Sequence, residues 1–125
     1  MKKLSVLLVD DREEFATALC QRLTLHGMEV ETANSGEDAL GILEEKTIDV
    51  VVLDVIMPGM GGLEILERIK NANPDIQVIL LTGHGSTKEG IEGMRLGAFD
   101  FLTKPVELEE LIAKMKTSMQ EMGKE

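Results

Sequence analysis

The stretch Ile48-Asp-Val-Val-Val-Leu-Asp54 decides the fold of this chain. Its valine-rich run predicts a β-strand over residues 48–53, because β-branched side chains pack well on a pleated surface. The run is apolar at successive positions and not at every second one, which is typical of a strand covered on both faces in a parallel sheet. Asp54 follows at the carboxyl end of this strand, and a Pro/Gly-rich loop over residues 57–62 comes next.

Strands and helices alternate on both sides of this stretch. Further strands are predicted over residues 5–9, 28–33, 76–81 and 98–102. Apolar residues at helical spacing predict helices that begin near Phe15, Ser35, Leu63, Thr87 and Glu107. Five strand–helix units with short connections predict one α/β domain over residues 1–125, with a parallel sheet covered by helices on both faces.

Composition excludes several classes of protein. The 125 residues are 43% hydrophobic, which favours a folded globule. No apolar run approaches the roughly 20 residues of a membrane span, and Asp10 and Asp11 interrupt the N-terminal run too early for a signal peptide. We therefore expect a cytoplasmic protein without membrane association. The net charge of −10, with no cluster of basic residues, argues against direct nucleic-acid binding.

Chemically active side chains follow the predicted strands. Asp10 and Asp11 follow the first strand, Asp54 the third and Thr82 the fourth, and Lys104 comes shortly after the fifth. In open α/β sheets, ligands bind beyond the carboxyl ends of the strands. The sequence therefore predicts that three carboxylates, a hydroxyl and a lysine gather at one edge of the sheet.

This set of side chains suits phosphoryl transfer. Clustered carboxylates repel one another unless they are protonated or bind a cation, and oxygen ligands favour magnesium (or manganese) over zinc. A lysine and a threonine beside such a site can contact an anionic group. A carboxylate can itself act as the nucleophile and form an aspartyl phosphate. Positioning and charge neutralisation supply most of the catalysis in this chemistry.

The whole chain resembles a receiver domain of two-component response regulators. The matching motifs, in order, are Val-Asp10-Asp11, Leu53-Asp54-Val-Ile-Met-Pro-Gly-Met-Gly-Gly62, Leu81-Thr82-Gly83 and Phe101-Leu-Thr-Lys104-Pro105. Any one of these motifs is weak evidence, but all of them at the right strand ends form a specific match. The resemblance implies a flavodoxin-like, doubly wound (βα)5 fold with strand order 2-1-3-4-5. It also implies that the chain holds a receiver domain and no output domain.

The resemblance also assigns an acceptor and a metal site. Asp54 would accept a phosphoryl group from the phosphohistidine of a sensor histidine kinase or phosphotransfer protein. Asp10, Asp11 and Asp54, together with the backbone carbonyl of Ile56, would hold Mg²⁺ or Mn²⁺. The protein would then be a phosphoacceptor switch that catalyses only its own phosphoryl transfer and dephosphorylation, and not an enzyme with a separate substrate.

Further residues take switch roles by the same resemblance. Thr82 and Lys104 would contact the phosphoryl group, and Lys104 would precede a cis peptide bond to Pro105. Phe101 stands where the family has a switch aromatic. Ile56 and His84 occupy the positions that flank the attacking water. Apolar Ile56 predicts slow self-dephosphorylation, whereas His84 either orients that water or is a solvated loop residue.

The output surface is expected on the fourth helix, the fifth strand and the fifth helix. This face would contact a downstream protein or a missing output domain, or form a homodimer on phosphorylation. Gly90 and Gly93 lie inside the fourth helix, and each costs about 1 kcal/mol relative to alanine, so we hypothesise that this helix is easily remodelled. Met119 and Met122 extend the apolar stripe of the last helix, either as a fraying tail or as a dimer face.

Three other functions compete with the receiver. A phosphatase of the haloacid-dehalogenase type uses an Asp-x-Asp motif, but Ile56 stands at the second acidic position. A flavodoxin-like flavin binder needs a phosphate loop after the first strand, where the acidic Asp10, Asp11, Glu13 and Glu14 would repel phosphate. A receiver that serves only as a non-phosphorylated binding module would not need the complete set of acids, threonine and lysine.

Overall fold

Strands and helices alternate along the computed structural model, which describes residues 3–57, 59–83 and 87–121. The elements of these described residues are β1 (Ser5–Val9), α1 (Glu13–Leu25), β2 (Glu29–Ala33), α2 (Gly36–Glu45), β3 (Val50–Asp54), α3 (Gly62–Ala72), β4 (Gln77–Thr82), α4 (Thr87–Arg95), β5 (Asp100–Thr103) and α5 (Leu108–Glu121).

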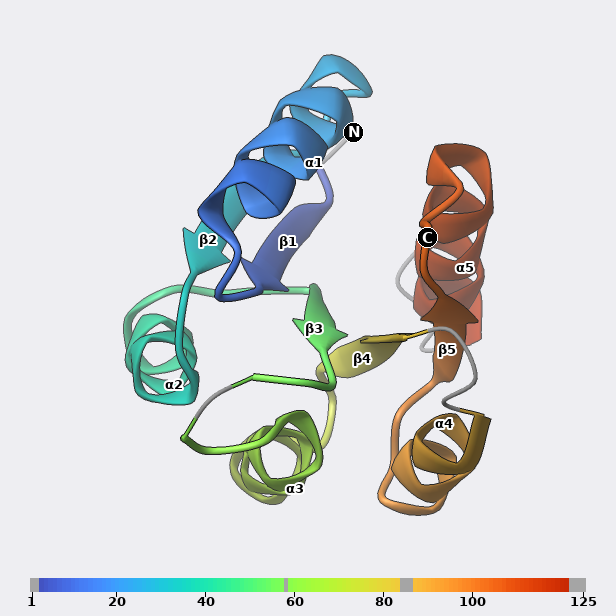
Figure 1. Cartoon of the computed structure of the whole chain (residues 1–125). Helices are drawn as coiled ribbons and strands as arrows, with labels where there is room; N and C mark the ends of the chain where they lie inside the picture. Colours follow the sequence, from blue (N-terminus) through green and yellow to red (C-terminus); the bar gives the residue numbers. More distant parts are fainter. Residues whose placement is uncertain (1–2, 58, 84–86, 122–125) are drawn as a thin grey trace.

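The strands form one parallel sheet in the order β2-β1-β3-β4-β5. Helices α1 and α5 cover one face of this sheet, and α2, α3 and α4 cover the other (Figure 1). The predicted doubly wound fold and its strand order are therefore confirmed. Because helices cover both faces of the sheet and successive side chains of a strand point to opposite faces, apolar residues are expected at every position of a strand.

Strand β3 lies between two hydrophobic cores and contributes side chains to both. All of its residues are buried. Val50 and Val52 belong to the core that β3 shares with α1 and α5, whereas Val51 and Leu53 belong to the core under α2 and α3. Asp54 is the last residue of this rigid strand, so its position is fixed by packing on both sides.

Some predicted boundaries shift by two residues. Strand β3 begins at Val50 and not at Ile48, because Asp49 is tied to the start of β1 by backbone and side-chain hydrogen bonds with Ser5. Strand β5 begins at Asp100 and not at Ala98, whose N–H donates to the carbonyl of Gly93 at 2.9 Å and so closes the end of α4.

Helix α4 turns an unexpected face toward the sheet. Ile91 and Met94, the large apolar residues of this helix, are 55% and 41% exposed. Gly90 and Gly93 are buried instead. A Cβ atom at Gly90 would lie 2.5 Å from the ring of Phe101, and one at Gly93 would collide with Leu80. The glycines therefore allow a close approach of helix and sheet, which the composition of the helix does not reveal.

The end of α5 is part of the core. Met119 is 4% exposed and packs in the cluster that α5 shares with α1 and the sheet. Neither a fraying tail nor a dimer face describes this residue, and Met122 lies outside the described residues. Within the residues described, no helix has both the length and the apolar character that crossing a membrane requires.

Candidate functional site

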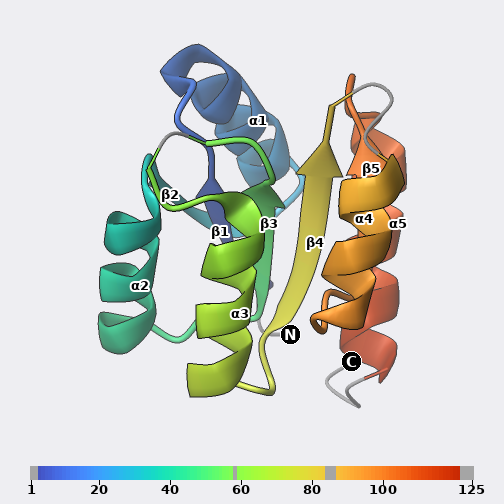
Figure 2. The same ribbon diagram turned by 60° about the horizontal axis from the view of Figure 1, so that its bottom comes forward.

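The carboxyl ends of the strands meet at one edge of the sheet (Figure 2). In the pairing of β1 with β3, Val9 lies beside Leu53, so the next residues, Asp10 and Asp54, are neighbours. In the pairing of β3 with β4, Asp54 lies beside Leu81, which places Thr82 one residue further along. The parallel register alone thus brings the sequence-predicted residues of β1, β3 and β4 to one place.

Three carboxylates form the centre of this edge. Asp10, Asp11 and Asp54 each offer an oxygen atom, and these atoms lie within 4.8 Å of one another. Asp10 and Asp54 are each only 4% exposed, whereas Asp11 is exposed. Oδ2 of Asp10 is buried without a hydrogen-bond partner among the residues that the structure describes. An all-oxygen donor set with an unsatisfied buried oxygen fits a hard divalent cation such as Mg²⁺.

Lys104 reaches the carboxylates from the segment after β5. Its Nζ lies 3.2 Å from Oδ2 of Asp54 and 3.7 Å from Oδ2 of Asp10. Its backbone N–H donates to the carbonyl of Thr82 at 2.8 Å, and its peptide bond to Pro105 is cis, as predicted. The lysine side chain is only 18% exposed, so it contributes a partly desolvated positive charge.

The environment of Asp54 raises the pKa of its carboxyl group. Burial is the largest cause, and the nearby Asp10 carboxylate adds to it, while Lys104 and the N–H of Ile56 act in the opposite direction. That N–H donates to Oδ1 of Asp54 at 3.3 Å. Without a divalent cation, the ionised form of Asp54 is therefore held at a cost to stability.

A stability measurement checks this electrostatic cost. Because the folded pKa of Asp54 is raised, its contribution to stability falls as pH rises from the ordinary value of 3.8 through the folded pKa. Asp54→Asn is thus expected to raise the free energy of unfolding at pH 7 in EDTA, and to lose this advantage below pH 3.8. Urea denaturation followed by circular dichroism measures both; an Asn variant less stable than wild type at pH 7 contradicts the expectation.

The other predicted residues are distributed around this centre. Thr82 is fully buried, and its hydroxyl donates to the carbonyl of Leu102 at 3.4 Å, so it must turn to reach a group on Asp54. Phe101 is half-buried on β5 against α4. The side chain of Ile56 is 66% exposed. His84 lies outside the described residues.

Two residues join the site without having been predicted there. The ring of Phe15, expected only as a core residue of the first helix, lies 5.0 Å from Nζ of Lys104 and 4.9 Å from Cζ of Arg12. Arg12 also places its Nε 3.6 Å from Oδ1 of Asp10. The sequence signal was the presence of an arginine directly after Asp11, where a helix start favours Ser, Thr, Asp or Asn.

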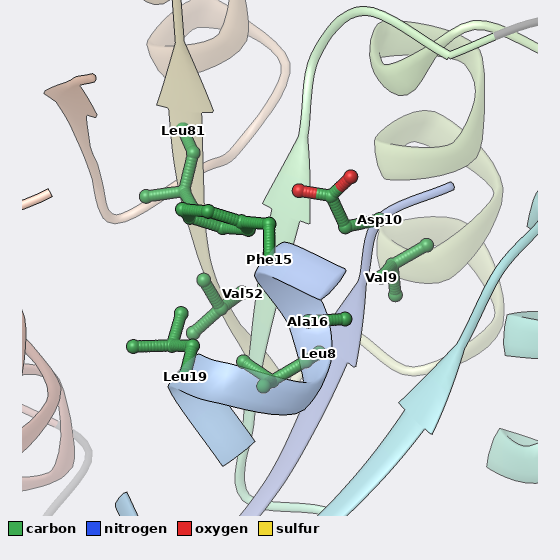
Figure 3. A pocket seen from close by; sticks show the side chains of 8 residues that line it. All are labelled: Leu8, Val9, Asp10, Phe15, Ala16, Leu19, Val52 and Leu81. Carbon is green, nitrogen blue, oxygen red and sulfur yellow. The ribbon is translucent and has the colours of Figure 1, made fainter. Parts of the chain in front are cut away.

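Phe15 also borders a small cavity beneath the acidic edge (Figure 3). Its ring is turned toward Leu81, and Asp10 lies at the same end of the cavity. The lining residues are Leu8, Val9, Asp10, Phe15, Ala16, Leu19, Val52 and Leu81. Apart from Asp10 this lining is apolar, so the cavity belongs to the packing of α1 on the sheet.

Comparisons with known proteins agree on one family. The family model described as "Response regulator receiver domain" matches residues 6–116. The transcriptional regulatory protein YkoG of Bacillus subtilis is 36% identical over 98% of this chain and 54% of its own length. The response regulator MprA of Mycolicibacterium vanbaalenii is 38% identical over 89% of this chain and 48% of its own length. The chain thus spans about half the length of these curated relatives.

A solved structure shows the same fold over its full length. The receiver domain protein from Clostridium thermocellum is 35% identical, superposes with a TM-score of 0.91, and is matched over 96% of this chain and 97% of its own. The sequence and fold comparisons therefore point to the same family as the motifs at the strand ends.

Proposed function

The chain belongs to the response regulator receiver domain family, and on this premise we propose that it accepts a phosphoryl group on Asp54 from a histidine kinase or phosphotransfer protein. The observation that carries the proposal is a buried Asp54 with Lys104 at 3.2 Å and two further carboxylates beside it. As a receiver domain of a two-component system, the chain is a signalling switch.

The residues at the sheet edge have distinct roles in this transfer. Asp10, Asp11, Asp54 and the carbonyl of Ile56 would hold Mg²⁺, which supplies charge neutralisation when bound. An oxygen of Asp54 attacks phosphorus and the P–N bond of phosphohistidine breaks. The electron pair of that bond returns to the imidazole nitrogen, and Asp54 becomes an acyl phosphate. Lys104 is placed to compensate the negative charge of the transferred group.

The phosphoryl group is then lost by hydrolysis of the acyl phosphate. Water attacks phosphorus, the O–P bond to Asp54 breaks, and inorganic phosphate leaves with the carboxylate restored. The exposed side chain of Ile56 offers this water no hydrogen bond, which supports the expectation of slow self-dephosphorylation. The role of His84 stays a prediction.

Phosphorylation would act as a switch through Thr82 and Phe101. The phosphoryl group adds about −1.5 to −2 charges and new acceptor oxygens. The Thr82 hydroxyl would leave the carbonyl of Leu102 for one of these oxygens, and Phe101 would repack against α4. We regard this as a population shift between two packings of the face formed by α4, β5 and α5.

The same face is the proposed output surface. Ile91 and Met94 expose apolar area on α4, although the rest of the helix is strongly polar. Such area suits contact with a downstream protein, an output domain or a second copy of the chain. The net charge of −10 does not support direct contact with nucleic acid.

Substitution of Gly90 tests the link between Phe101 and α4. Gly90→Ala is expected to destabilise the protein by about 1–2 kcal/mol despite the better helix propensity of alanine, because its Cβ would overlap the Phe101 ring. Gly41→Ala is the matched control: this glycine lies inside α2 with nothing within 4 Å, so alanine should stabilise by about 0.5–1 kcal/mol. Urea denaturation measures both, and stabilisation by Gly90→Ala would contradict the packing.

Incubation with Mg²⁺ and acetyl phosphate, followed by intact mass spectrometry, tests the proposed function. We expect a mass gain of one phosphoryl group in wild type and none in Asp54→Asn. No gain in wild type would favour a non-phosphorylated binding module. Continuous release of phosphate from varied phosphoesters would favour a phosphatase of the haloacid-dehalogenase type.

A further inference from the structure

Arg12 stands at the start of a helix, a position where arginine does not favour helix formation. It is the N-cap residue of α1, and its side chain makes no capping hydrogen bond among the described residues. A cation there also opposes the positive end of the helix dipole. Residues that break a local rule without a structural gain are concentrated at functional sites, which directs attention to what Arg12 contacts.

The Arg12 side chain is held at the mouth of the acidic site. Its guanidinium lies over the ring of Phe15 at 4.9 Å, and its Nε lies 3.6 Å from Oδ1 of Asp10. Nζ of Lys104 also lies over this ring, 5.0 Å from the ring centroid. Phe15 therefore gathers two cations beside the carboxylates. Lys104 is mostly buried, whereas Arg12 is 54% exposed and meets solvent.

The charge of Arg12 is not required to orient Asp10. Oδ1 of Asp10 accepts a hydrogen bond from the backbone N–H of Arg12 at 2.9 Å, a contact that any residue except proline keeps. The buried Oδ2 of Asp10 has no hydrogen-bond partner among the described residues and lies 3.7 Å from Nζ of Lys104. Removing the guanidinium would thus change the electrostatics of the site while the carboxylate stays in place.

We propose that Arg12 positions the phosphoryl dianion of the incoming donor and does so at the expense of Mg²⁺ affinity. A dianion approaching three carboxylates is repelled, and an exposed guanidinium at the rim attracts it before Lys104 can. The same positive charge, 3.6 Å from Asp10, would repel a divalent cation that the carboxylates hold. The two effects of one charge therefore have opposite signs. This inference rests on the proposed phosphorylation of Asp54.

The test compares Arg12→Gln and Arg12→Lys with a matched control. Arg22→Gln removes the same charge from an exposed position near the other end of α1, about 15 Å away along the helix and beyond the screening length at physiological salt. Mg²⁺ affinity is measured by calorimetry on the unphosphorylated protein without any donor. The phosphorylation rate is then measured against the concentration of phosphoramidate at saturating Mg²⁺. When phosphoramidate is the donor, its P–N bond breaks and ammonia leaves.

For Arg12→Gln we expect the half-saturating phosphoramidate concentration to rise about threefold or more and the Mg²⁺ dissociation constant to fall about threefold. Arg12→Lys and Arg22→Gln should stay close to wild type in both. Any other result for Arg12→Gln, including no change or a loss of both affinities together, overturns the proposal. If wild type itself takes up no phosphoryl group, the proposed function fails instead, which is a different observation.

Discussion

Lys104→Met is expected to slow phosphorylation of Asp54 by about 100-fold, the usual effect of removing one preorganised charge from the reacting group. Nζ of Lys104 lies 3.2 Å from Oδ2 of Asp54 and 3.7 Å from Oδ2 of Asp10, so it is placed to meet the charge of the transferred phosphoryl group. The rate is measured by mass spectrometry with acetyl phosphate and saturating Mg²⁺. The variant should also bind Mg²⁺ more tightly, because a competing cation has been removed.

Lys116→Met is the control for this experiment. Lys116 is an exposed residue of α5, and its replacement changes the net charge of the chain by the same amount. We expect a rate within about twofold of wild type, since the effect of a single exposed charge is weakened by solvent and salt. If Lys104→Met phosphorylates as fast as this control, the electrostatic account of Lys104 is wrong.

Gly62→Ala is expected to lower the free energy of unfolding by about 3 kcal/mol and the phosphorylation rate at least about tenfold. A Cβ atom at Gly62 would lie 2.5 Å from Cα of Val55 and 2.7 Å from the carbonyl oxygens of Asp54 and Val55. These are backbone atoms of Asp54 and Val55, so no rotamer change can relieve the overlap. The N–H of Gly62 also donates to the carbonyl of Val55 at 2.9 Å, which fixes the start of α3 against Asp54.

The neighbouring glycine provides the comparison. Gly61 is the N-cap of α3 and has φ of −70°, and a Cβ atom added to it would meet nothing within 4 Å. Gly61→Ala should therefore cost less than about 1 kcal/mol and leave the rate close to that of wild type. Equal effects of the two substitutions, measured by urea denaturation and by phosphorylation with acetyl phosphate, would show that close backbone packing at Gly62 does not matter.

The fold was predictable because its signals are local. The Val-rich run before Asp54, the alternation of strands and helices, and the N-cap Ser35, whose Oγ accepts from the N–H of Asp38 at 3.1 Å, all act over a few residues. The parallel sheet then converts sequence order into spatial order. The gathering of Asp10, Asp54 and Lys104 at one edge follows from this topology and from no feature of those residues alone.

The features that the sequence did not predict depend on contacts between segments that are far apart in the chain. The helical spacing of Ile91 and Met94 is visible in the sequence. The sequence does not show the packing that buries Gly90 and Gly93 and turns the two larger residues outward. Likewise Phe15 fits a helical apolar stripe, and its second contact with Lys104 requires the fold of the whole sheet. Such tertiary contacts outweigh the local pattern.

The charges of the site suggest one physical theme for its function. The ionised form of Asp54 is disfavoured by burial and by Asp10, and Lys104 only partly compensates. A divalent cation would favour that ionised form, and a phosphoryl group would then add negative charge beside Lys104 and Thr82. The cation and the phosphoryl group would thus each change the electrostatic balance that the other meets at Asp54.

Chemical mapping of the phosphoryl group tests the central claim most directly. The protein is treated with acetyl phosphate and Mg²⁺, and the acyl phosphate is reduced with borohydride, which converts a phosphorylated aspartate to homoserine. Peptide mass spectrometry then locates the change. We predict homoserine at position 54 alone, and none when Mg²⁺ is replaced by EDTA. Homoserine at position 10 or 11, or none at position 54 with Mg²⁺ present, would contradict phosphorylation of Asp54.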